Sequence, residues 1–381
     1  MERKLIVLAG PHDCINAPVM LDVPGAEGDV ELTDCSKNKT VACQASGGKV
    51  YFIEEKLLAG TQKGYVLRTN IGSTKRAARV KLNMVENERV DILISGKLFS
   101  SYQFAAKWAR PFLHPVMGPN DKPITRAYPV LQGIEGETQD HPHHKSFYVA
   151  WGDVNGANVW SETEGHGCMV HKEFLAVKEG PVYGEIIARN DWVDNQGKKL
   201  LEEIRTVRVY ATPAKCRFVD LGVALRMTEG KVRFGDTKEG GICSIRVASS
   251  MDEKAGKGGI IVNSYGGTGE KETWGKRAHW CDYSGPVDGE TVGIAIFDNP
   301  NNFRYPTYWH VRSYGLMTAN PFGLSHFEPG RGRDGSLEVE AGERLEFNYR
   351  VYFHSGDAAK GKVADRFLNY VAPPTVNVQE Q

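Results

Sequence analysis

The nine residues LEFNYRVYF, numbers 345–353, decide the fold class of this chain. Large side chains at 345, 347, 349, 351 and 353 alternate with the residues at 346, 348, 350 and 352. Successive side chains of a β-strand point to opposite faces, so a period of two lets one face pack on a core. The stretch therefore predicts a β-strand with one buried face.

Short stretches of the same kind recur along the chain, and turn-forming residues separate them. They lie at residues 80–85, 90–98, 184–193, 204–210, 217–225 and 241–248. Pairs such as Asp288-Gly289 and Asp334-Gly335 mark turns, and 42 glycines suit a chain with many of them. One helix is predicted near the end, from Asp357 to the residues before Pro373. Many strands and few helices favour an all-β sandwich.

The first 72 residues are predicted to form a unit of their own. Short strands are expected there at residues 4–9, 19–23, 30–33, 41–44, 50–53 and 65–67. That content suits a compact immunoglobulin-like β-sandwich. The polar run at residues 72–76 has the composition of a linker. We therefore predict an immunoglobulin-like β-sandwich at residues 1–72 and a large β domain at residues 73–381.

The charge balance excludes two classes of partner. Lys plus Arg and Asp plus Glu both number 47, so the formal net charge of the 381 residues is zero. A neutral chain has no electrostatic attraction to nucleic acid or to an anionic membrane surface. No apolar run is long enough to span a bilayer. We therefore predict neither a nucleic-acid nor a membrane partner.

The cysteines and the N-terminus bear on the compartment. The seven cysteines include no CxxC pair, which suits free thiols in a reducing compartment. The apolar run at residues 5–10 is too short for a signal peptide. The expected location is the cytoplasm, or the periplasm or exterior if the N-terminus has been trimmed.

Three of the eleven histidines cluster at residues 140–145, with the sequence DHPHHK. Pro142 prevents this stretch from being a helix interior. On an extended chain His141 and His143 point to one side and His144 to the other. Imidazoles suit general acid/base catalysis and metal binding, and the neighbouring Lys145 suits binding of a developing oxyanion. A polar surface loop with exposed histidines is the alternative.

A second dense region, residues 279–328, combines aromatic and hydrogen-bonding side chains. A carbohydrate site needs this mixture, because the apolar face of a sugar stacks on an aromatic ring while polar groups meet its hydroxyls. The alternative is that Trp280 and Trp309 belong to the core. The region also contains Asp282, Tyr283, His310, Arg312, Tyr314, Asn320, His326 and Glu328.

Together the two regions predict one sugar-type site. The predicted catalytic residues are His144, His310, His141 and Lys145. The predicted substrate-binding residues are Arg126, Arg246, Trp309, Arg312, Asn320, His326 and Glu328. A divalent metal ion is the one cofactor considered, with His141, His143 and His310 as its predicted ligands. Neither a GxSxG nucleophile motif nor a P-loop is present.

Several of these motifs, in this order, resemble a bacterial family that carries the label "methane oxygenase PmoA-like". The resemblance covers roughly residues 75–370. The label itself names a membrane subunit that needs transmembrane helices, and this sequence has no run that suits one. The motifs are Arg126, Tyr128-Pro129, residues 140–146, residues 151–156, Trp160, residues 282–286, residues 303–306, residues 309–312 and residues 319–323.

The resemblance implies a galactose-mutarotase-like supersandwich, preceded by an immunoglobulin-like module. Many proteins on that scaffold bind or transform sugars, although a fold alone does not prove an activity. We therefore predict a carbohydrate-active enzyme, a lyase, hydrolase or epimerase. It would cleave or rearrange a glycoside or an oxidised (keto) sugar by histidine-based acid/base chemistry, with or without a metal. The alternatives are a non-catalytic sugar-binding protein and a metal-dependent oxygenase.

Overall fold

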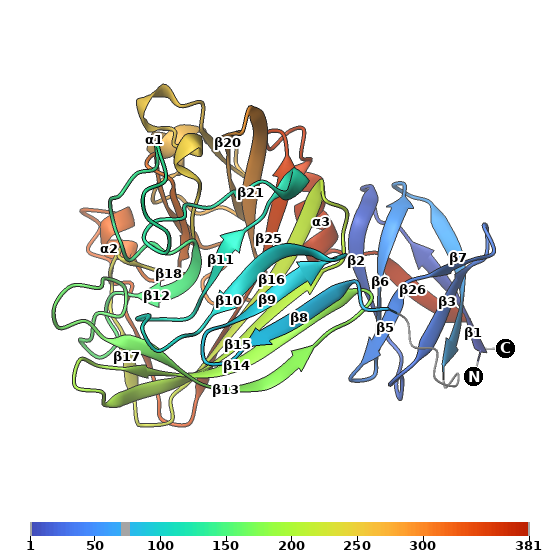
Figure 1. Ribbon diagram of the computed structural model, residues 1–381, viewed down its shortest axis with the longest axis horizontal. Coiled ribbons are helices and arrows are strands. Elements are labelled where there is room, and N and C mark those ends of the chain that lie inside the picture. Colours follow the sequence, from blue (N-terminus) through green and yellow to red (C-terminus); the bar gives the residue numbers. More distant parts are fainter. Residues whose placement is uncertain (1, 70–76, 380–381) are drawn as a thin grey trace.

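The computed structural model describes residues 2–69 and 77–379, which form a small β-sandwich beside a much larger one (Figure 1). Both ends of the described chain lie in the small sandwich. The predicted boundary at residue 72 and the predicted linker at residues 72–76 lie outside the described residues. The division of the chain at that point stays a prediction.

The small sandwich consists of a five-stranded and a three-stranded antiparallel sheet. The first has the order β26 (Thr375–Gln379), β1 (Glu2–Leu8), β7 (Gln62–Thr69), β3 (Val30–Asp34) and β4 (Lys39–Val41). The second has the order β2 (Cys14–Asp22), β6 (Lys49–Leu57) and β5 (Cys43–Ser46). The placement of residues 375–379 in the large domain was wrong, because β26 pairs with β1.

The large sandwich consists of two eight-stranded antiparallel sheets. The first large sheet has the order β22 (Tyr308–Arg312), β23 (Leu316–Asn320), β18 (Gly240–Arg246), β12 (Phe147–Trp151), β11 (Phe112–Val116), β10 (Lys97–Gln103), β9 (Arg89–Ile94) and β8 (Val80–Val85). The second large sheet has the order β13 (Cys168–Lys178), β14 (Tyr183–Val193), β15 (Lys199–Tyr210), β16 (Cys216–Arg226), β25 (Arg344–Ser355), β21 (Glu290–Asp298), β20 (Trp280–Val287) and β19 (Ile260–Asn263). A two-stranded sheet pairs β17 (Val232–Phe234) with β24 (Leu337–Val339).

The main hydrophobic core lies between the two large sheets. It takes Trp151 and Trp309 from the first sheet and Trp192, Phe347 and Phe353 from the second, all with at most 1% of their surface exposed. The alternation at residues 345–353 is that of β25, which pairs with β16 and β21 in the middle of the second sheet. The predicted fold class, an all-β chain with a large supersandwich and a small N-terminal sandwich, is confirmed.

Two predicted elements end elsewhere than expected. Residues 90–98 do not form one strand, because Ser95 and Gly96 both have positive φ and make the turn between β9 and β10. Helix α3 covers Val363–Val371 and begins six residues after Asp357, because Lys362 has a left-handed φ of 52°. The other helices are α1 (Gly269–Thr273), α2 (Leu324–Phe327) and three 3-10 turns at Pro119–Asp121, Ser249–Met251 and Lys254–Gly256.

The two sandwiches contact each other through aromatic and amide side chains. The ring of Tyr51 in β6 meets that of Tyr183 in β14 edge to face, at 5.0 Å between centroids. The Gln44 side-chain oxygen accepts hydrogen bonds from the backbone N–H groups of Val182 and Tyr183, both at 3.3 Å. Within residues 2–69 and 77–379, no helix is long and apolar enough to cross a membrane.

The outer face of the first large sheet, which points away from the core, carries a row of mostly polar side chains. Residues directly opposite in an antiparallel ladder share a face. Tyr148, Ser244, Thr318 and His310 are successive partners across β12, β18, β23 and β22, and so form one row. All four are buried. Tyr148 packs against His144 and Trp160, and His310 packs against Trp274 and Phe327. The candidate functional site lies on this outer face of the first large sheet.

Candidate functional site

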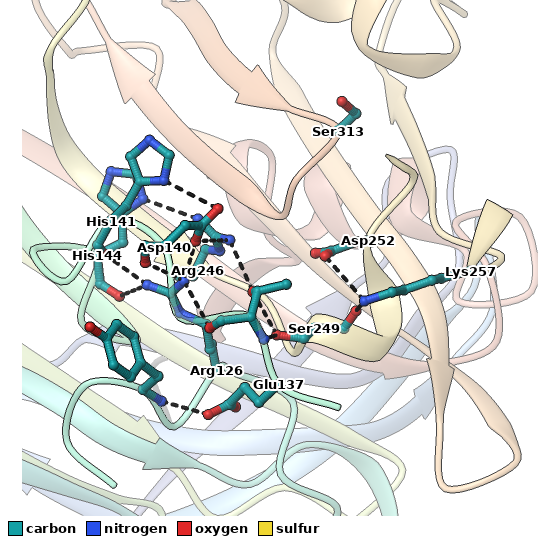
Figure 2. Close-up of polar contacts among 12 residues, drawn as sticks. Arg126, Glu137, Asp140, His141, His144, Arg246, Ser249, Asp252, Lys257 and Ser313 are labelled. Carbon is teal, nitrogen blue, oxygen red and sulfur yellow. Dashed lines mark hydrogen bonds and ion pairs between the residues drawn. The ribbon is translucent and has the colours of Figure 1, made fainter. Parts of the chain in front are cut away.

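Two buried arginines hold the carboxylate of Asp140 (Figure 2). Arg126 and Arg246 have no exposed surface, and the Asp140 Oδ1 atom accepts hydrogen bonds from Arg126 Nη1 at 2.5 Å and Arg246 Nη2 at 2.8 Å. Burial opposes ionisation of Asp140, but the charges of Arg246 and Arg126 outweigh it and lower the pKa of the carboxyl. Asp140 is therefore held as a carboxylate at neutral pH.

Arg126 also fixes the backbone of the histidine loop. Its guanidinium donates to the carbonyl oxygens of Asp140 at 2.7 Å, His141 at 2.8 Å and His144 at 3.3 Å. His141 has a φ of 43°, in the left-handed region that non-glycine residues rarely occupy. Strain of this kind persists only where the surroundings determine it, and it concentrates at functional sites. Arg126 supplies those surroundings here.

His141 is the histidine of the cluster that solvent reaches most. Its side chain is 40% exposed, and its Nδ1 atom lies 3.3 Å from Asp140 Oδ2. The ring is stacked against both His144 and Tyr314, at centroid distances of 4.8 and 4.9 Å and interplanar angles of 5° and 9°. No hydrogen bond within the described chain engages its Nε2 atom. The carboxylate therefore lies beside Nδ1 without a hydrogen bond to it, and the second ring nitrogen is available to a substrate.

His144 is buried and uncharged. Burial, followed by the charges of its neighbours, lowers the pKa of His144 well below its usual value. Its Nδ1 atom lies 3.3 Å from Arg246 Nη1, which can only donate a hydrogen bond. The proton of the neutral ring is therefore on Nε2. His144 supports the ring of His141, and its predicted role in acid/base catalysis stays a prediction.

His143 points toward Trp160, which packs against the histidine loop. Its ring meets Trp160 at 5.9 Å between centroids, and its carbonyl oxygen accepts a hydrogen bond from Arg110 at 3.2 Å. Burial and the charge of Arg110 lower the pKa of His143 to about 3. Arg110 also donates to the carbonyl oxygen of Trp160 at 2.6 Å. The side of the loop away from Asp140 is thus packed into the protein.

Lys145 points away from the other predicted catalytic groups. Its Nζ atom makes close contacts with both carboxylate oxygens of Glu162, and Glu162 also lies 3.5 Å from Arg110. Burial lowers the pKa of Lys145 to about 8, although Glu162 opposes the shift. The contacts place Lys145 in a buried ion-pair network that supports the loop, so its predicted catalytic role does not fit them.

His310 lies on the same sheet face as the histidine loop but at its far side. Its Nδ1 atom accepts a hydrogen bond from the Trp274 indole N–H at 3.0 Å, so a neutral ring carries its proton on Nε2. Three strand spacings separate Tyr148, beside His144, from His310, which is roughly 14 Å. Tyr148 and His310 therefore lie at opposite ends of this row.

The burial of His310 predicts a specific pH dependence of stability. Burial and the charge of Arg312 lower the pKa of His310 to about 3, against about 6.5 in an unfolded chain. The unfolded chain thus binds this proton more readily between pH 3 and 6.5, so stability is lost as the pH falls through that range. In His310→Asn, an amide oxygen can replace the acceptor Nδ1.

Urea denaturation at pH 7 and pH 5 measures this effect. The wild type is expected to lose about 2 kcal/mol more than His310→Asn over that interval. Between pH 7 and pH 8 the two proteins should change alike. An equal loss in both proteins between pH 7 and pH 5 would show that His310 is not held neutral.

The predicted metal site is not formed. In the part of the chain that the structure describes, no three His, Cys, Asp or Glu side chains are placed to hold a metal ion. His141 and His143 lie in one loop, with ring centroids 5.8 Å apart. The Nδ1 atom of His310 is already bonded to Trp274 on the far side of the sheet face. The prediction of these three histidines as metal ligands was therefore wrong.

Two predicted substrate-binding residues have other roles. Trp309 has no exposed surface, belongs to the core between the large sheets and donates to the carbonyl oxygen of Ala278 at 2.9 Å. Asn320 is also fully buried. Its amide nitrogen donates to the carbonyls of Thr237 and Lys238, and its oxygen accepts from the N–H groups of Phe322 and Gly323. Both were predicted wrongly, because neither can contact a substrate.

The other predicted binding residues lie around the sheet face. Arg312 is 33% exposed, contacts the Tyr314 ring and lies 3.3 Å from Glu270. His326 is exposed on α2. Glu328 accepts a hydrogen bond from the Tyr308 hydroxyl at 2.5 Å and lies 3.2 Å from Arg333. Its carboxylate is engaged at the edge of the sheet.

Sequence reasoning missed four side chains of this region. Arg110 and Glu162 support the histidine loop, and Trp274 bonds to His310. Asp252 is buried near Lys257, at 3.6 Å, and burial raises its pKa to about 6 although the charge of Arg246 opposes the shift. The one sequence feature that could have indicated Trp274 as a site residue is that it is aromatic. No local pattern connects the other three with residues 140–145.

Comparison with solved structures finds distant similarity to two proteins of Enterococcus faecalis. One is a protein in the glycosyl hydrolase family 38, with a TM-score of 0.48 and 9% sequence identity. The other is an alpha-mannosidase from strain V583, with a TM-score of 0.47 and 10% identity. The alignments cover 100% of this chain and 47% and 46% of those chains, so the present chain spans just under half of their length.

Comparison with curated proteins finds no match. A family model described as a family of unknown function matches residues 89–367, from β9 to the middle of α3. The matched range contains the histidine loop, both buried arginines and the whole row on the outer face of the first large sheet. The description does not carry the methane oxygenase label. The chain therefore belongs to the DUF6807 family, a family of unknown function.

Proposed function

We propose that this protein is a carbohydrate-active enzyme in which His141 transfers a proton to or from a sugar substrate. The observation that carries the proposal is the pair of Asp140 and His141, which two fully buried arginines hold at the outer face of the first large sheet. A carboxylate beside Nδ1 orients an imidazole and stabilises the imidazolium that forms when Nε2 takes a proton.

The surroundings of His141 support a sugar as the substrate. Tyr314 and Trp274 present partly exposed aromatic rings, and Arg312 contacts both of them. Lys238 and Glu239 lie near the same face and are each 43% exposed. Aromatic rings beside a few charged groups suit the apolar face and the hydroxyls of a sugar.

The charges favour a lyase or an epimerase over a hydrolase. Hydrolysis of a glycoside by the usual route needs a carboxylic acid that protonates the leaving group and a second carboxylate. Asp140 cannot supply that acid, because its pKa is lowered. Asp252, whose pKa burial raises to about 6, is buried beside Lys257. One imidazole base and a nearby arginine instead suit abstraction of a proton from a carbon next to a carbonyl or carboxylate. His141 would take the proton, and Arg312 would stabilise the negative oxygen.

A substrate panel tests the proposed function. The full chain is incubated with native glycosides, keto-glycosides and uronate-containing oligosaccharides, and the products are identified by mass spectrometry. The expected result is turnover of an oxidised sugar. Saturable binding without turnover of any member would contradict the proposal and favour a non-catalytic sugar-binding protein.

A further inference from the structure

A hollow lies on the outer face of the second large sheet, on the opposite side of the large sandwich from the histidine loop. It has a volume of about 590 Å³ and lies between β19, β20 and the segment at residues 357–365. That size is within the range of small-molecule sites, about 300–1,000 Å³. The catalytic proposal uses none of its residues.

Trp280 forms the aromatic wall of this cavity. Along β20, Cys281 and Tyr283 face the core between the sheets, so Trp280 and Ser284 face outward. The indole is half-buried, and Phe297 is its partner across the sheet. Trp280 belongs to the dense aromatic region at residues 279–328, for which core packing was the alternative, and the structure leaves part of its surface uncovered beside a cavity.

The rest of the cavity is lined by small apolar and by charged or polar side chains. Ala358, Ala359 and Ala364 leave room that larger side chains would fill. Asp357, Thr268, Lys362 and Asp365 also line it. Within the described residues no ion pair engages Lys362 or Asp365, so both charged groups can meet a ligand. Two carboxylates against one ammonium group disfavour an anionic ligand.

We propose that this cavity is a second carbohydrate-binding site that takes a neutral sugar ring stacked on Trp280. The ring's apolar face lies on the indole, and its hydroxyls reach the carboxylates and the ammonium group at the rim. Both sheets and their shared core separate the cavity from His141, so the two sites bind independently. The proposal does not depend on the catalytic role of His141.

Indole NMR signals test the site directly in the full chain. The chain has seven tryptophans, and the Trp280 signal is identified by its loss in Trp280→Phe. Cellobiose, maltose and mannobiose are the neutral probes, and digalacturonate is the anionic one. At least one neutral disaccharide is expected to shift the Trp280 signal saturably, whereas the signal of buried Trp309 stays unchanged. Digalacturonate is expected to have no effect.

Two variants locate the binding. Ala359→Phe places a large ring in the cavity at an exposed position, so it should abolish the shift while the protein still folds. His141→Gln should leave the shift intact, since His141 lies in a loop over the outer face of the first large sheet. The proposal fails if no neutral disaccharide moves the Trp280 signal, if digalacturonate moves it equally, or if the shift persists in Ala359→Phe.

Discussion

Asp140→Asn is expected to destabilise the protein by about 2–3 kcal/mol at pH 7. Removing one partner of a fully buried ion pair costs about 3–5 kcal/mol, because the other charge is left uncompensated. Here two arginines with no exposed surface would lose their shared anion. The Asp140 side chain is 41% exposed, so water screens part of the effect and the expected value is lower. Urea denaturation measures it.

The pH dependence and two further variants check the cause. The pKa of Asp140 is lowered in the folded protein, so the stability it contributes is lost as the pH falls below the usual carboxyl range. The gap between wild type and Asp140→Asn should therefore narrow in acid. Asp22→Asn removes an exposed partner of Lys49 and should cost at most about 0.5 kcal/mol. Adding Arg246→Met to Asp140→Asn should cost less than the sum of the single changes.

An Asp140→Asn variant as stable as Asp22→Asn would contradict this account. It would mean that the two arginines are satisfied without the carboxylate. Arg126 alone would then hold the loop carbonyls, and the carboxylate of Asp140 would not be needed to fix the backbone of His141.

His141→Gln is expected to lower kcat/KM by about 10²–10⁴-fold on a substrate that the wild type turns over. General acid/base catalysis contributes a factor of that size, and glutamine can form hydrogen bonds but cannot take the proton. Stability should change little, because the side chain is 40% exposed and either residue must adopt the same left-handed backbone. Steady-state kinetics and a thermal melt measure the two quantities.

His166→Gln is the matched control for this variant. His166 is a partly buried histidine whose Nδ1 atom lies 2.7 Å from the carbonyl oxygen of Gly167 in a loop before β13. Its replacement should leave kcat/KM unchanged. Equal rates for His141→Gln and the wild type would remove His141 from the reaction.

The alternation of side chains made the fold class predictable. Period-two patterns are local, so residues 345–353 indicate β25 without knowledge of its partners. The same pattern shows that Trp309 and His310 face opposite sides of one strand. It does not say which side a loop covers, so Trp309 was predicted to bind substrate although it belongs to the core. The return of β26 to β1 depends on contacts between the chain ends, which no local pattern records.

The candidate site was predictable in part for the same reason. The cluster at residues 140–145 is visible in the sequence, and His141 and Arg126 do meet there. Tyr314 stacks on His141, and Arg246 binds the neighbouring Asp140. Both residues lie more than 100 positions further along the chain, and the register of the first large sheet brings them to the loop. Spacing along the chain likewise could not show that His310 bonds to Trp274 and lies away from the loop.

Solvent deuterium exchange tests the central claim, that His141 transfers a proton to or from a sugar carbon. The wild type and His141→Gln are each incubated in D₂O with the substrate found in the panel, and the recovered substrate and product are analysed by mass spectrometry. The account predicts one deuterium on a sugar carbon with the wild type and none above background with His141→Gln. Turnover without deuterium on carbon, or equal incorporation by both proteins, would contradict it.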